Sequence, residues 1–363
     1  AYIARTKLYA ASKLNNPSMD RKKWEDARDA LSAVMGLNIY DLYYDTQNPE
    51  LSYAHYFCER KTKENIYTYL LAANATMHSN LPQGAPWNEK SYVGCTPTQN
   101  LVDAYDMKDG TEPITGYDAN GQPIINKNSG YDDKNPYENR DPRLKMTIFY
   151  HGNTFDLNGS QQALDMTDVD DKSKSSGYLV LKYLDDRIGH KSSGNSNYDC
   201  NPQMIRYAEI LLSYVEALNN LTGSHTVTFS DESTGTYTRD MNEMAKYFNM
   251  VRYRAGLPGL TTDELSSADK MFDIIVRERM IEFLHENRRF YDVRRWGIYL
   301  DTEKEPIVGM NTDGFEDEFF QRTTVNHLFA RTRVADKKMV FLPIPRAELR
   351  KVPLMDQNPG WDN

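Results

Sequence analysis

Apolar residues recur at helical spacing near the start of the chain. The first stripe has a 3-4-3 spacing and predicts a helix over residues 1–14; its members are Ala1, Ala4, Leu8 and Ala11. Residues 15–18 interrupt this pattern, and a second stripe predicts a helix over residues 20–35, ended by Gly36; its members are Trp24, Ala27, Leu31 and Val34. Two helices within about 34 residues, with small residues where they cross, are typical of a tetratricopeptide-type hairpin.

The helical pattern returns after residue 201. A continuous stripe from Ile205 to Leu218 predicts one helix, and residues 241–254 predict a second, which the segment Gly256-Leu257-Pro258-Gly259 stops. Residues 268–286 predict a third, with its stripe at Phe272, Ile275, Val276, Met280, Phe283 and Leu284. The tail, residues 339–361, is rich in proline, and we expect Pro343, Pro345 and Pro359 to hold it extended against the scaffold.

Between residues 40 and 200 the pattern changes to short apolar runs and long polar connections. The runs predict brief strands at residues 66–71, 147–150 and 178–181. The connections are rich in Gly, Asn, Asp and Ser and cover residues 74–91, 111–141 and 189–201. Loops of this length are uncommon in compact domains unless they bind a ligand or are disordered. The sequence therefore predicts a mainly α protein with ligand-facing loops at 40–200.

Composition and charge exclude several classes of protein. The net charge is −9, and Lys and Arg are interleaved with Asp and Glu, so the basic footprint of a nucleic-acid-binding protein is missing. No stretch approaches the roughly 20 apolar residues of a membrane-spanning helix. The three cysteines, Cys58, Cys95 and Cys200, are widely separated, which argues against a disulfide framework or a zinc cluster. The 25 tyrosines hint at surfaces that pack on one side and hydrogen-bond on the other.

Motifs of catalysis are missing from the sequence. HExxH, P-loop, GxSxG and GxGxxG patterns do not occur, and none of the 7 histidines has another at i,i+4. A glycosidase needs only a spatial pair of carboxylates, which 52 acidic residues could hide. The Asp-rich run at 165–171 lacks the glycine and terminal Glu of an EF-hand loop, so we expect a solvated loop, although a structural Ca²⁺ remains open. We predict no enzyme activity and no cofactor.

Several separated segments carry a family resemblance. Residues 206–219, RYAEILLSYVEALN, resemble the R-Y-A-E-x-L-L-x-Y-x-E-A-x-N helix of the SusD/RagB family. The pattern from Arg277 to Gly297 is similar to that family's R-E-R…E…D-L-R-R-W-G signature, and the ending resembles its P-I-P-x-x-E…Q-N-P-G-Y/W motif. Residues 96–110 and 140–144 match further motifs in the same order. The signature positions are Arg206, Glu209, Glu216, Glu282, Glu286, Arg289, Asp292, Arg295, Trp296, Pro343, Pro345, Asn358 and Pro359.

This resemblance implies a fold, a location and a partner. Family members have tetratricopeptide-like helical hairpins, an α–α superhelix, with long loops and a few short strands packed on one side. They are lipoproteins on the outer face of the Bacteroidetes outer membrane, where they cap a SusC-type TonB-dependent barrel and capture glycans. We expect a lipidated Cys and the first hairpins to precede Ala1. Residues 1–36 would be one hairpin of the N-terminal half, and residues 37–363 the C-terminal region, in one structural unit.

Ligand contacts are predicted in the loops before residue 95. Sugars are held by aromatic planes and by polar side chains that bond to hydroxyls. The candidates are Trp87, Tyr92, Tyr53, Tyr56, Asn74 and His78, with Trp87 as the first choice. Each aromatic could instead be a packing residue, which is the more common role of a large ring.

Two other functions remain open from the sequence. One is a RagB-like oligopeptide-binding lipoprotein of the same import system, and the other is a tetratricopeptide-type scaffold for protein interactions. We expect the signature charges to be structural and to pair within one helical turn, Arg279 with Glu282, Glu286 with Arg289 and Asp292 with Arg295. Their density beside aromatic residues predicts partly buried, bidentate pairs that fix helix orientation, with a catalytic Glu pair as the alternative.

Overall fold

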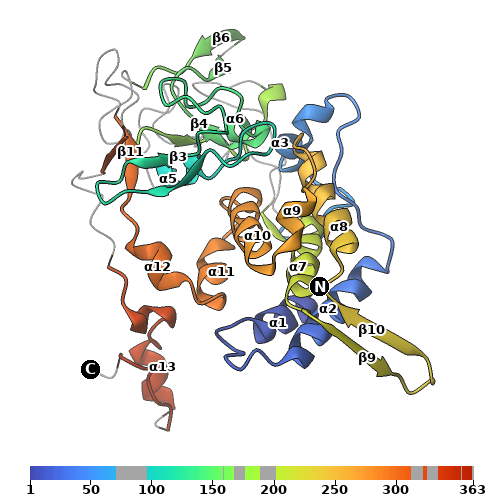
Figure 1. Cartoon of the computed structure of the whole chain (residues 1–363). Helices are drawn as coiled ribbons and strands as arrows, with labels where there is room; N and C mark the ends of the chain where they lie inside the picture. Colours follow the sequence, from blue (N-terminus) through green and yellow to red (C-terminus); the bar gives the residue numbers. More distant parts are fainter. Residues whose placement is uncertain are drawn as a thin grey trace.

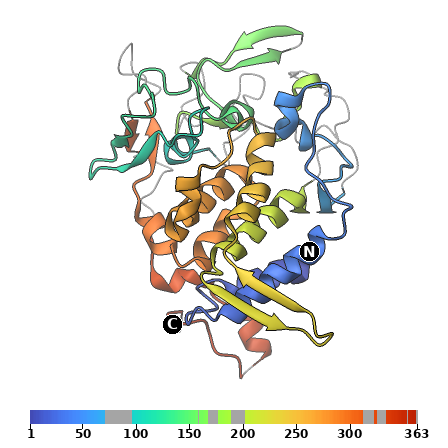
Figure 2. The same ribbon diagram turned by 45° about the vertical axis from the view of Figure 1, so that its right-hand side comes forward.

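The chain forms a block of helices with a layer of loops and short strands on one side (Figure 1). The computed structural model describes residues 1–70, 96–157, 159–166, 176–188, 202–311, 322–324, 334–352 and 354–361. The 45° view in Figure 2 shows the same division, with the strand layer above the helices and the β9–β10 hairpin (Ser224–Thr228, Thr234–Thr238) projecting from the block. The prediction of a mainly α fold with few short strands is confirmed.

The first hairpin consists of α1 (Tyr2–Ala11) and α2 (Arg21–Met35). The α2 helix begins where the Asp20 side chain accepts a hydrogen bond from the Lys22 backbone N–H, which satisfies one of the donors left over at a helix start. Both predicted stripes face the core, and Ala4 and Ala27 are buried. Their small side chains let the two helices approach closely, as the sequence predicts.

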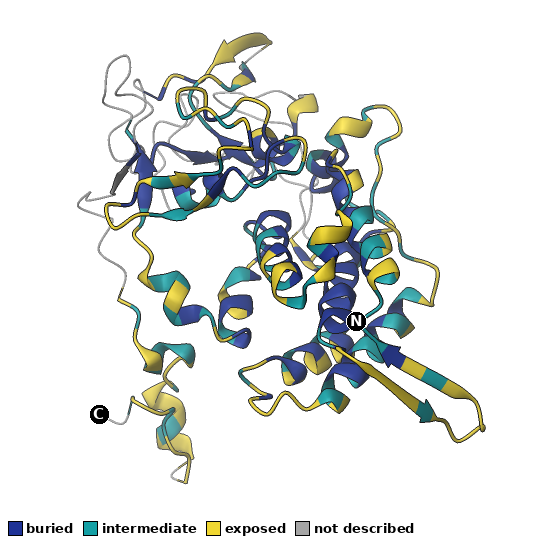
Figure 3. Ribbon diagram, in the orientation of Figure 1, coloured by how far each residue is buried: buried dark blue, intermediate teal, exposed yellow. Residues whose placement is uncertain are grey.

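Helix α7 (Tyr207–Asn219) is the centre of the helical block. Every one of its residues is buried, which Figure 3 shows as an uninterrupted dark ribbon. A helix that is apolar around most of its circumference is expected to lie inside a domain. It packs against α2, α8 (Met241–Arg254) and α10 (Ala268–Glu282), whose bounds agree with the sequence prediction to within a few residues.

The remaining helices are short and bring the chain back to the strand layer. Asp240 caps α8, and the small helix α9 (Thr262–Ser266) begins with a capping box between Thr261 and Glu264. After α10 come α11 (Arg289–Arg295) and α12 (Tyr299–Lys304). The loop side contributes η1 (Pro49–Leu51), α3 (Ser52–Tyr56), α5 (Gln99–Asp103), α6 (Pro142–Thr147) and η3 (Asp186–Ile188).

Each sheet among the described residues is an antiparallel pair of strands. The predicted strands are confirmed: β1 (Asn65–Thr68) pairs with β8 (Gln203–Arg206), and β4 (Ile148–Phe149) pairs with β7 (Leu179–Val180). The other pairs are β2–β3 (Ile114–Tyr117, Pro123–Ile125), β5–β6 (Thr154–Leu157, Ser160–Ala163) and β11–β12 (Val308–Met310, Arg322–Thr324). A two-stranded ribbon is marginal by itself, so this layer depends on packing against the helices.

The C-terminal tail differs from the prediction of an extended segment held against the scaffold. It contains η5 (Lys337–Val340) and α13 (Arg346–Lys351), and none of its described residues is buried (Figure 3). The Gln357 side chain bonds to both backbone groups of Ile344, at 2.7 and 2.9 Å. The indole N–H of Trp361 is shared by the carbonyls of Lys338 and Phe341. Pro343, Pro345 and Pro359 therefore lie in a tail whose described side-chain hydrogen bonds join one part of the tail to another.

A buried ion network joins the strand layer to the helices. We call it the interlayer ion cluster; its members are Glu64, Arg143, Lys182, Arg206, Arg254, Glu278, Glu282 and Glu286. The Arg206 guanidinium lies 2.8 Å from Glu64, 2.7 Å from Glu282 and 2.8 Å from Glu286. Fully buried charges are tolerated only when they are paired and hydrogen-bonded. The strand layer is thus fixed to the helices by partners far apart in sequence.

A second buried network ties α7 to α11. The Arg295 guanidinium donates hydrogen bonds to both carboxylate oxygens of Glu216, and its Nε lies 2.8 Å from the Asp292 carboxylate. The indole N–H of Trp296 donates to Glu216 at 2.8 Å, and Arg279 lies 2.9 Å from Asp292. The predicted buried, bidentate pairing is confirmed here, and so is the local pair Asp292–Arg295.

The other predicted local pairs need correction. Arg279 pairs with Asp292 instead of Glu282, which is wrapped by Arg143, Arg206 and Arg254. Glu286 bonds to Lys182 and Arg206. These side chains point inward, where a partner from another element replaces the water that an exposed i,i+3 pair would keep. These signature charges therefore connect different elements of the tertiary structure and do not pair along the surface of one helix.

The networks predict a loss of stability in acid. Burial raises the pKa of the Glu282 carboxyl, but the guanidinium groups of Arg254, Arg206 and Arg143 outweigh burial and leave the pKa below its ordinary value. The same balance, burial against two arginines, lowers the pKa of Asp292. A carboxyl with a lowered folded pKa stabilises the protein above its unfolded pKa, about 4. We expect the melting temperature to be level near neutrality and to fall steeply below about pH 4.5. A melting temperature that stays level down to about pH 3 would contradict this.

Candidate functional site

The predicted ligand residues fall into two groups. Trp87, Tyr92, Asn74 and His78 lie outside the described residues, and their role stays a prediction. Tyr53 and Tyr56 are 1% and 0% exposed.

These two tyrosines are core residues, which corrects the prediction that they contact ligand. The Tyr53 hydroxyl donates to the carbonyl of Glu282 at 2.8 Å, and the Tyr56 hydroxyl donates to Asn65 at 2.9 Å. Their rings pack beside Phe57 and the cations of the interlayer ion cluster. A ring with no exposed face cannot stack on a sugar. The sequence favoured packing as the more common role, and the structure agrees with that alternative.

A groove lies between α10 and the loop layer. It is made of two adjoining hollows of about 410 and 610 Å³ that share Glu112, Asp273 and Arg277. Carboxylates outnumber cations along it, so we call it the acidic groove. Its charged lining residues are Asp103, Asp109, Glu112, Asp118, Asp263, Glu264, Asp273 and Glu305, with Arg252, Lys270 and Arg277.

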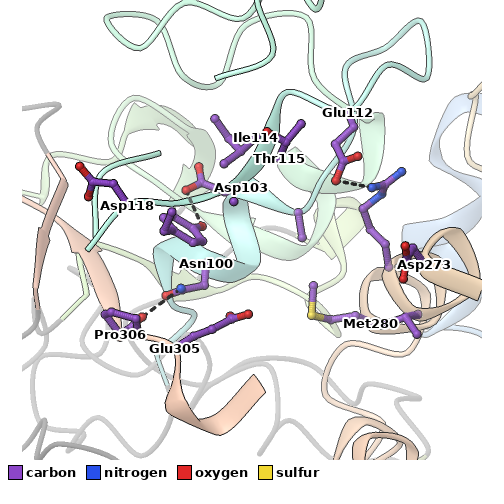
Figure 4. A pocket seen from close by; sticks show the side chains of 15 residues that line it. Asn100, Asp103, Glu112, Ile114, Thr115, Asp118, Asp273, Met280, Glu305 and Pro306 are labelled. Atoms are coloured by element: carbon purple, nitrogen blue, oxygen red, sulfur yellow. Dashed lines mark hydrogen bonds and ion pairs between the residues drawn. The ribbon is translucent and has the colours of Figure 1, made fainter. Parts of the chain in front are cut away.

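One wall of the groove comes from α5 and the β2–β3 ribbon. Asp103 accepts from Gln99, Tyr117 and Arg322 at 2.7–2.8 Å, so its charge is fully engaged in holding this wall together. Asn100 donates to the Pro306 carbonyl at 3.1 Å and accepts from the Val308 backbone N–H, which fixes the wall to the segment after α12. Figure 4 shows Asn100 and Glu305 on one side of the hollow, with Ile114 and Thr115 above it.

The opposite wall is the outward face of α10. Val276 and Met280 supply apolar surface, and Asp273 lies one turn before Val276 and two turns before Met280. Figure 4 shows Asp273 and Met280 on this side of the hollow. Arg277 spans the groove and pairs with Glu112 at 2.5 Å and with Asp106 at 3.2 Å. Burial and the nearby Glu112 charge raise the pKa of Asp273, against the pull of Arg277. Asp273 is exposed at the point where the two hollows meet, so its carboxylate can reach a ligand in either of them.

The groove offers a defined chemistry. Carboxylate and amide oxygens accept hydrogen bonds from hydroxyl groups, and the apolar strip of Val276 and Met280 can cover the C–H face of a ring. The excess of negative charge disfavours a polyanionic ligand. The arrangement therefore fits a neutral, hydroxyl-rich chain molecule.

The predicted ligand-facing region at 40–200 supplies one wall of the groove, including Glu112 and Asp118. The sequence prediction missed the other wall, because it expected the segment after Arg206 to be scaffold, whereas Asp273 and Arg277 on α10 line the groove. The predicted stripe of this helix was partly wrong: the buried face includes Met271, Ile274 and Ile275, whereas Val276 and Met280 are only half-buried and line the groove. The meeting of Asp273 and Arg277 with Glu112 is a long-range contact that no local pattern contains.

A model of the SusD family matches residues 55–361. The chain belongs to the SusD family. The resemblance deduced from the motifs is thereby confirmed, and the interlayer ion cluster lies within the matched region.

Individual relatives extend this result. The chain is 30% identical over 177 residues to the SusD-like protein P2 of Formosa agariphila, a match that covers 47% of this chain and 28% of that protein. A crystal structure of a SusD-like protein from Bacteroides fragilis is 26% identical and superposes with a TM-score of 0.72 over 99% of this chain and 64% of that one. A SusD-like carbohydrate-binding protein from the same species has a TM-score of 0.63 at 23% identity, covering 96% of this chain and 62% of that one, and shows the shared fold. The chain thus spans less than two thirds of the length of these proteins.

Metal and membrane features complete the description of this SusD-family chain. Among the described residues, no group of three His, Cys, Asp or Glu side chains is placed to hold a metal ion. Most of the Asp-rich run at 165–171 lies outside those residues. No described helix has the length and apolarity needed to cross a bilayer. Cys58 is buried, whereas Cys95 and Cys200 lie outside the described residues.

Proposed function

We propose that this SusD-family protein binds a neutral glycan at the bacterial cell surface and delivers it to a SusC-type TonB-dependent transporter. It would be held in the outer membrane by an N-terminal lipid anchor and would act by binding, without catalysis, metal or cofactor. The observation that carries the proposal is the acidic groove, with hydrogen-bond acceptors along an apolar strip. The family membership supports it, as does the shared fold of the SusD-like carbohydrate-binding protein.

The groove predicts the kind of glycan that binds. Each sugar hydroxyl that donates to a carboxylate makes a charge-assisted hydrogen bond, whereas each uronate or sulfate would bring a like charge into the groove. We expect neutral oligosaccharides to bind in calorimetric titrations and alginate oligomers of equal length to bind at least tenfold more weakly. Tighter binding of alginate would contradict this choice of ligand.

Asp273 is the residue to change first. Replacing it with alanine removes an acceptor from the centre of the groove, and we expect the Kd for the best neutral oligosaccharide to rise about tenfold, the equivalent of roughly 1.4 kcal/mol. Asp269→Ala is the matched control, because Asp269 is an exposed carboxylate one turn earlier on α10 and does not line the groove. Equal affinities of the two variants would remove the groove from the binding site. Enrichment of peptides instead of glycans from a mixed pool would point to the RagB-like alternative.

A further inference from the structure

The acidic groove is divided at its middle. Its first hollow, of about 410 Å³, faces the β2–β3 ribbon and the segment after α12, and its second, of about 610 Å³, faces the loop between α8 and α9. Each hollow has the size of a small-molecule site, about 300–1,000 Å³. Among the described residues, Glu112, Asp273 and Arg277 alone line both hollows, so these three residues lie at the junction between them.

An ion pair reaches across this junction. Arg277 belongs to α10 and Glu112 to the loop before β2, and Arg277 Nη1 lies 2.5 Å from Glu112 Oε1. Figure 4 shows Glu112 and Asp273 together at one end of the first hollow, away from Asn100 and Pro306. A ligand that continues from one hollow into the other therefore meets the Arg277–Glu112 ion pair.

The two partners of this ion pair are held unequally. The Glu112 side chain is 41% exposed, and among the described residues its carboxylate has no hydrogen-bonded or ion-paired partner besides Arg277. The Arg277 side chain is only 17% exposed and has a second partner, the buried Asp106, at 3.2 Å. An ion pair with a member this exposed adds little stability. Glu112 is therefore the partner that a ligand can displace.

Asp106 balances the charge of Arg277 when Glu112 is displaced. The Asp106 Oδ1 atom is buried and accepts no hydrogen bond, although Arg277 Nε lies 3.2 Å from it. The other carboxylate oxygen, Oδ2, accepts from Arg252 at 3.2 Å, which holds Asp106 in place. A buried acceptor without a donor is costly, so a small shift of Arg277 toward Asp106 is favourable. The guanidinium thus has a stable position without Glu112.

A sugar can replace Glu112 at the Arg277 guanidinium. Glu112 and Asp273 offer only acceptors at the junction, whereas Arg277 carries five N–H donors in one plane. An oxygen of a sugar unit that crosses the junction accepts a charge-assisted hydrogen bond from Arg277, and the hydroxyls of the same unit donate to the carboxylates. A sugar that stays inside one hollow does not need to displace Glu112.

We propose that the Arg277–Glu112 ion pair determines the length of glycan that the protein prefers. The pair keeps the two hollows apart when the ligand is short. It opens when a neutral glycan spans both hollows, and Arg277 then donates to the sugar unit at the junction in place of Glu112. This inference rests on the proposed glycan-binding function and deepens it, because it gives opposite roles to the two partners: Glu112 opposes the long ligand, and Arg277 holds it.

The test compares short and long sugars in calorimetric titrations of the full chain. The probes are the disaccharides and hexasaccharides of the malto, cello, laminari and manno series, and the measured quantity is the Kd of the disaccharide divided by the Kd of the hexasaccharide. In Glu112→Gln the long ligand no longer breaks an ion pair, so this ratio should rise about fivefold. In Arg277→Met the junction has lost its donor, so the ratio should fall about fivefold.

Asp269→Asn is the matched control. It also removes one carboxylate, but Asp269 is exposed on α10 and lines neither hollow, so the ratio should equal that of the parent protein. Circular dichroism melting checks that each variant is folded. We expect folded variants, because Glu112 is partly exposed and because Asp106 keeps Arg252 as its partner in Arg277→Met.

The outcomes separate this inference from the proposed function. Opposite shifts of the ratio in Glu112→Gln and Arg277→Met support it, since a pair that only held the two walls together would give shifts of the same sign. An unchanged or lower ratio in Glu112→Gln overturns the inference by itself, and the acidic groove stands if Asp273→Ala still weakens binding. If no neutral glycan binds to the parent protein, the proposed function fails and this inference fails with it.

Discussion

Replacing Arg206 with methionine is expected to lower the free energy of unfolding by about 3–5 kcal/mol, the usual cost of removing one partner from a buried ion pair. The Arg206 guanidinium contacts the carboxylates of Glu64, Glu282 and Glu286, all of which are buried. Methionine fills similar space but offers these carboxylates no donor, so they stay buried with fewer partners. Since domains are typically stable by only about 5–15 kcal/mol, the loss is a large part of the total. Urea denaturation followed by circular dichroism measures it.

The control for this variant is Lys270→Met. Lys270 pairs with Asp263 at 2.9 Å, but both side chains are more than half exposed. Exposed pairs contribute about 0–1 kcal/mol, so this variant should unfold close to the parent. If both variants lose the same stability, the interlayer ion cluster does not hold the layers together as described.

Arg295→Lys is the second large effect that we expect, with a loss of about 2–3 kcal/mol, somewhat below the cost of deleting a buried partner because the charge remains. Arg295 bonds to both oxygens of Glu216, to Asp292 and to the Ser12 hydroxyl. A lysine ammonium is a single point with no planar fork, and it cannot satisfy Glu216 and Asp292 together. Contacts between α1, α7 and α11 should loosen as a result.

The neighbouring residue provides the matched comparison. Arg294 is only half-buried, and its guanidinium lies 3.7 Å from the centroid of the Phe290 ring. Arg294→Lys keeps a cation over this ring at the surface, so a change below about 1 kcal/mol is expected. Amide hydrogen exchange of α11 gives an independent readout, because faster exchange should appear in Arg295→Lys alone. Similar exchange in the two variants would argue against the proposed role of Arg295.

The sequence predicted local structure well because that structure follows from local pattern. The helix at 241–254 has the predicted bounds, since an Asp cap and a Gly-Leu-Pro-Gly stop define its ends. The strands at 148–149 and 179–180 lie inside predicted apolar runs, although nothing in either run reveals that they pair with each other. Motifs spread over most of the chain identified the family.

Long-range contacts set the limit of prediction. Glu282 was assigned a partner three residues away, but its partners Arg143 and Arg206 come from distant segments, because the side chain points into the core and not along the helix surface. Tyr53 and Tyr56 belong to a segment rich in polar and aromatic residues, and this composition is also that of a sugar-binding site. Only the structure shows that both rings are buried and cannot reach a ligand. The acidic groove needs Glu112 beside Asp273, and only the tertiary fold brings them together.

The interlayer ion cluster also has a consequence for the order of folding. Glu64 and Arg143 pair with Arg206, Glu278 and Glu282, which lie 135 to 142 residues later in the sequence. Contacts between residues so far apart form slowly, because the chain between them must first close into a loop. Until α10 has folded against the strand layer, these charges stay hydrated and the layer cannot close into a dry interior. We therefore expect a fragment that ends before α10 to stay open to proteases.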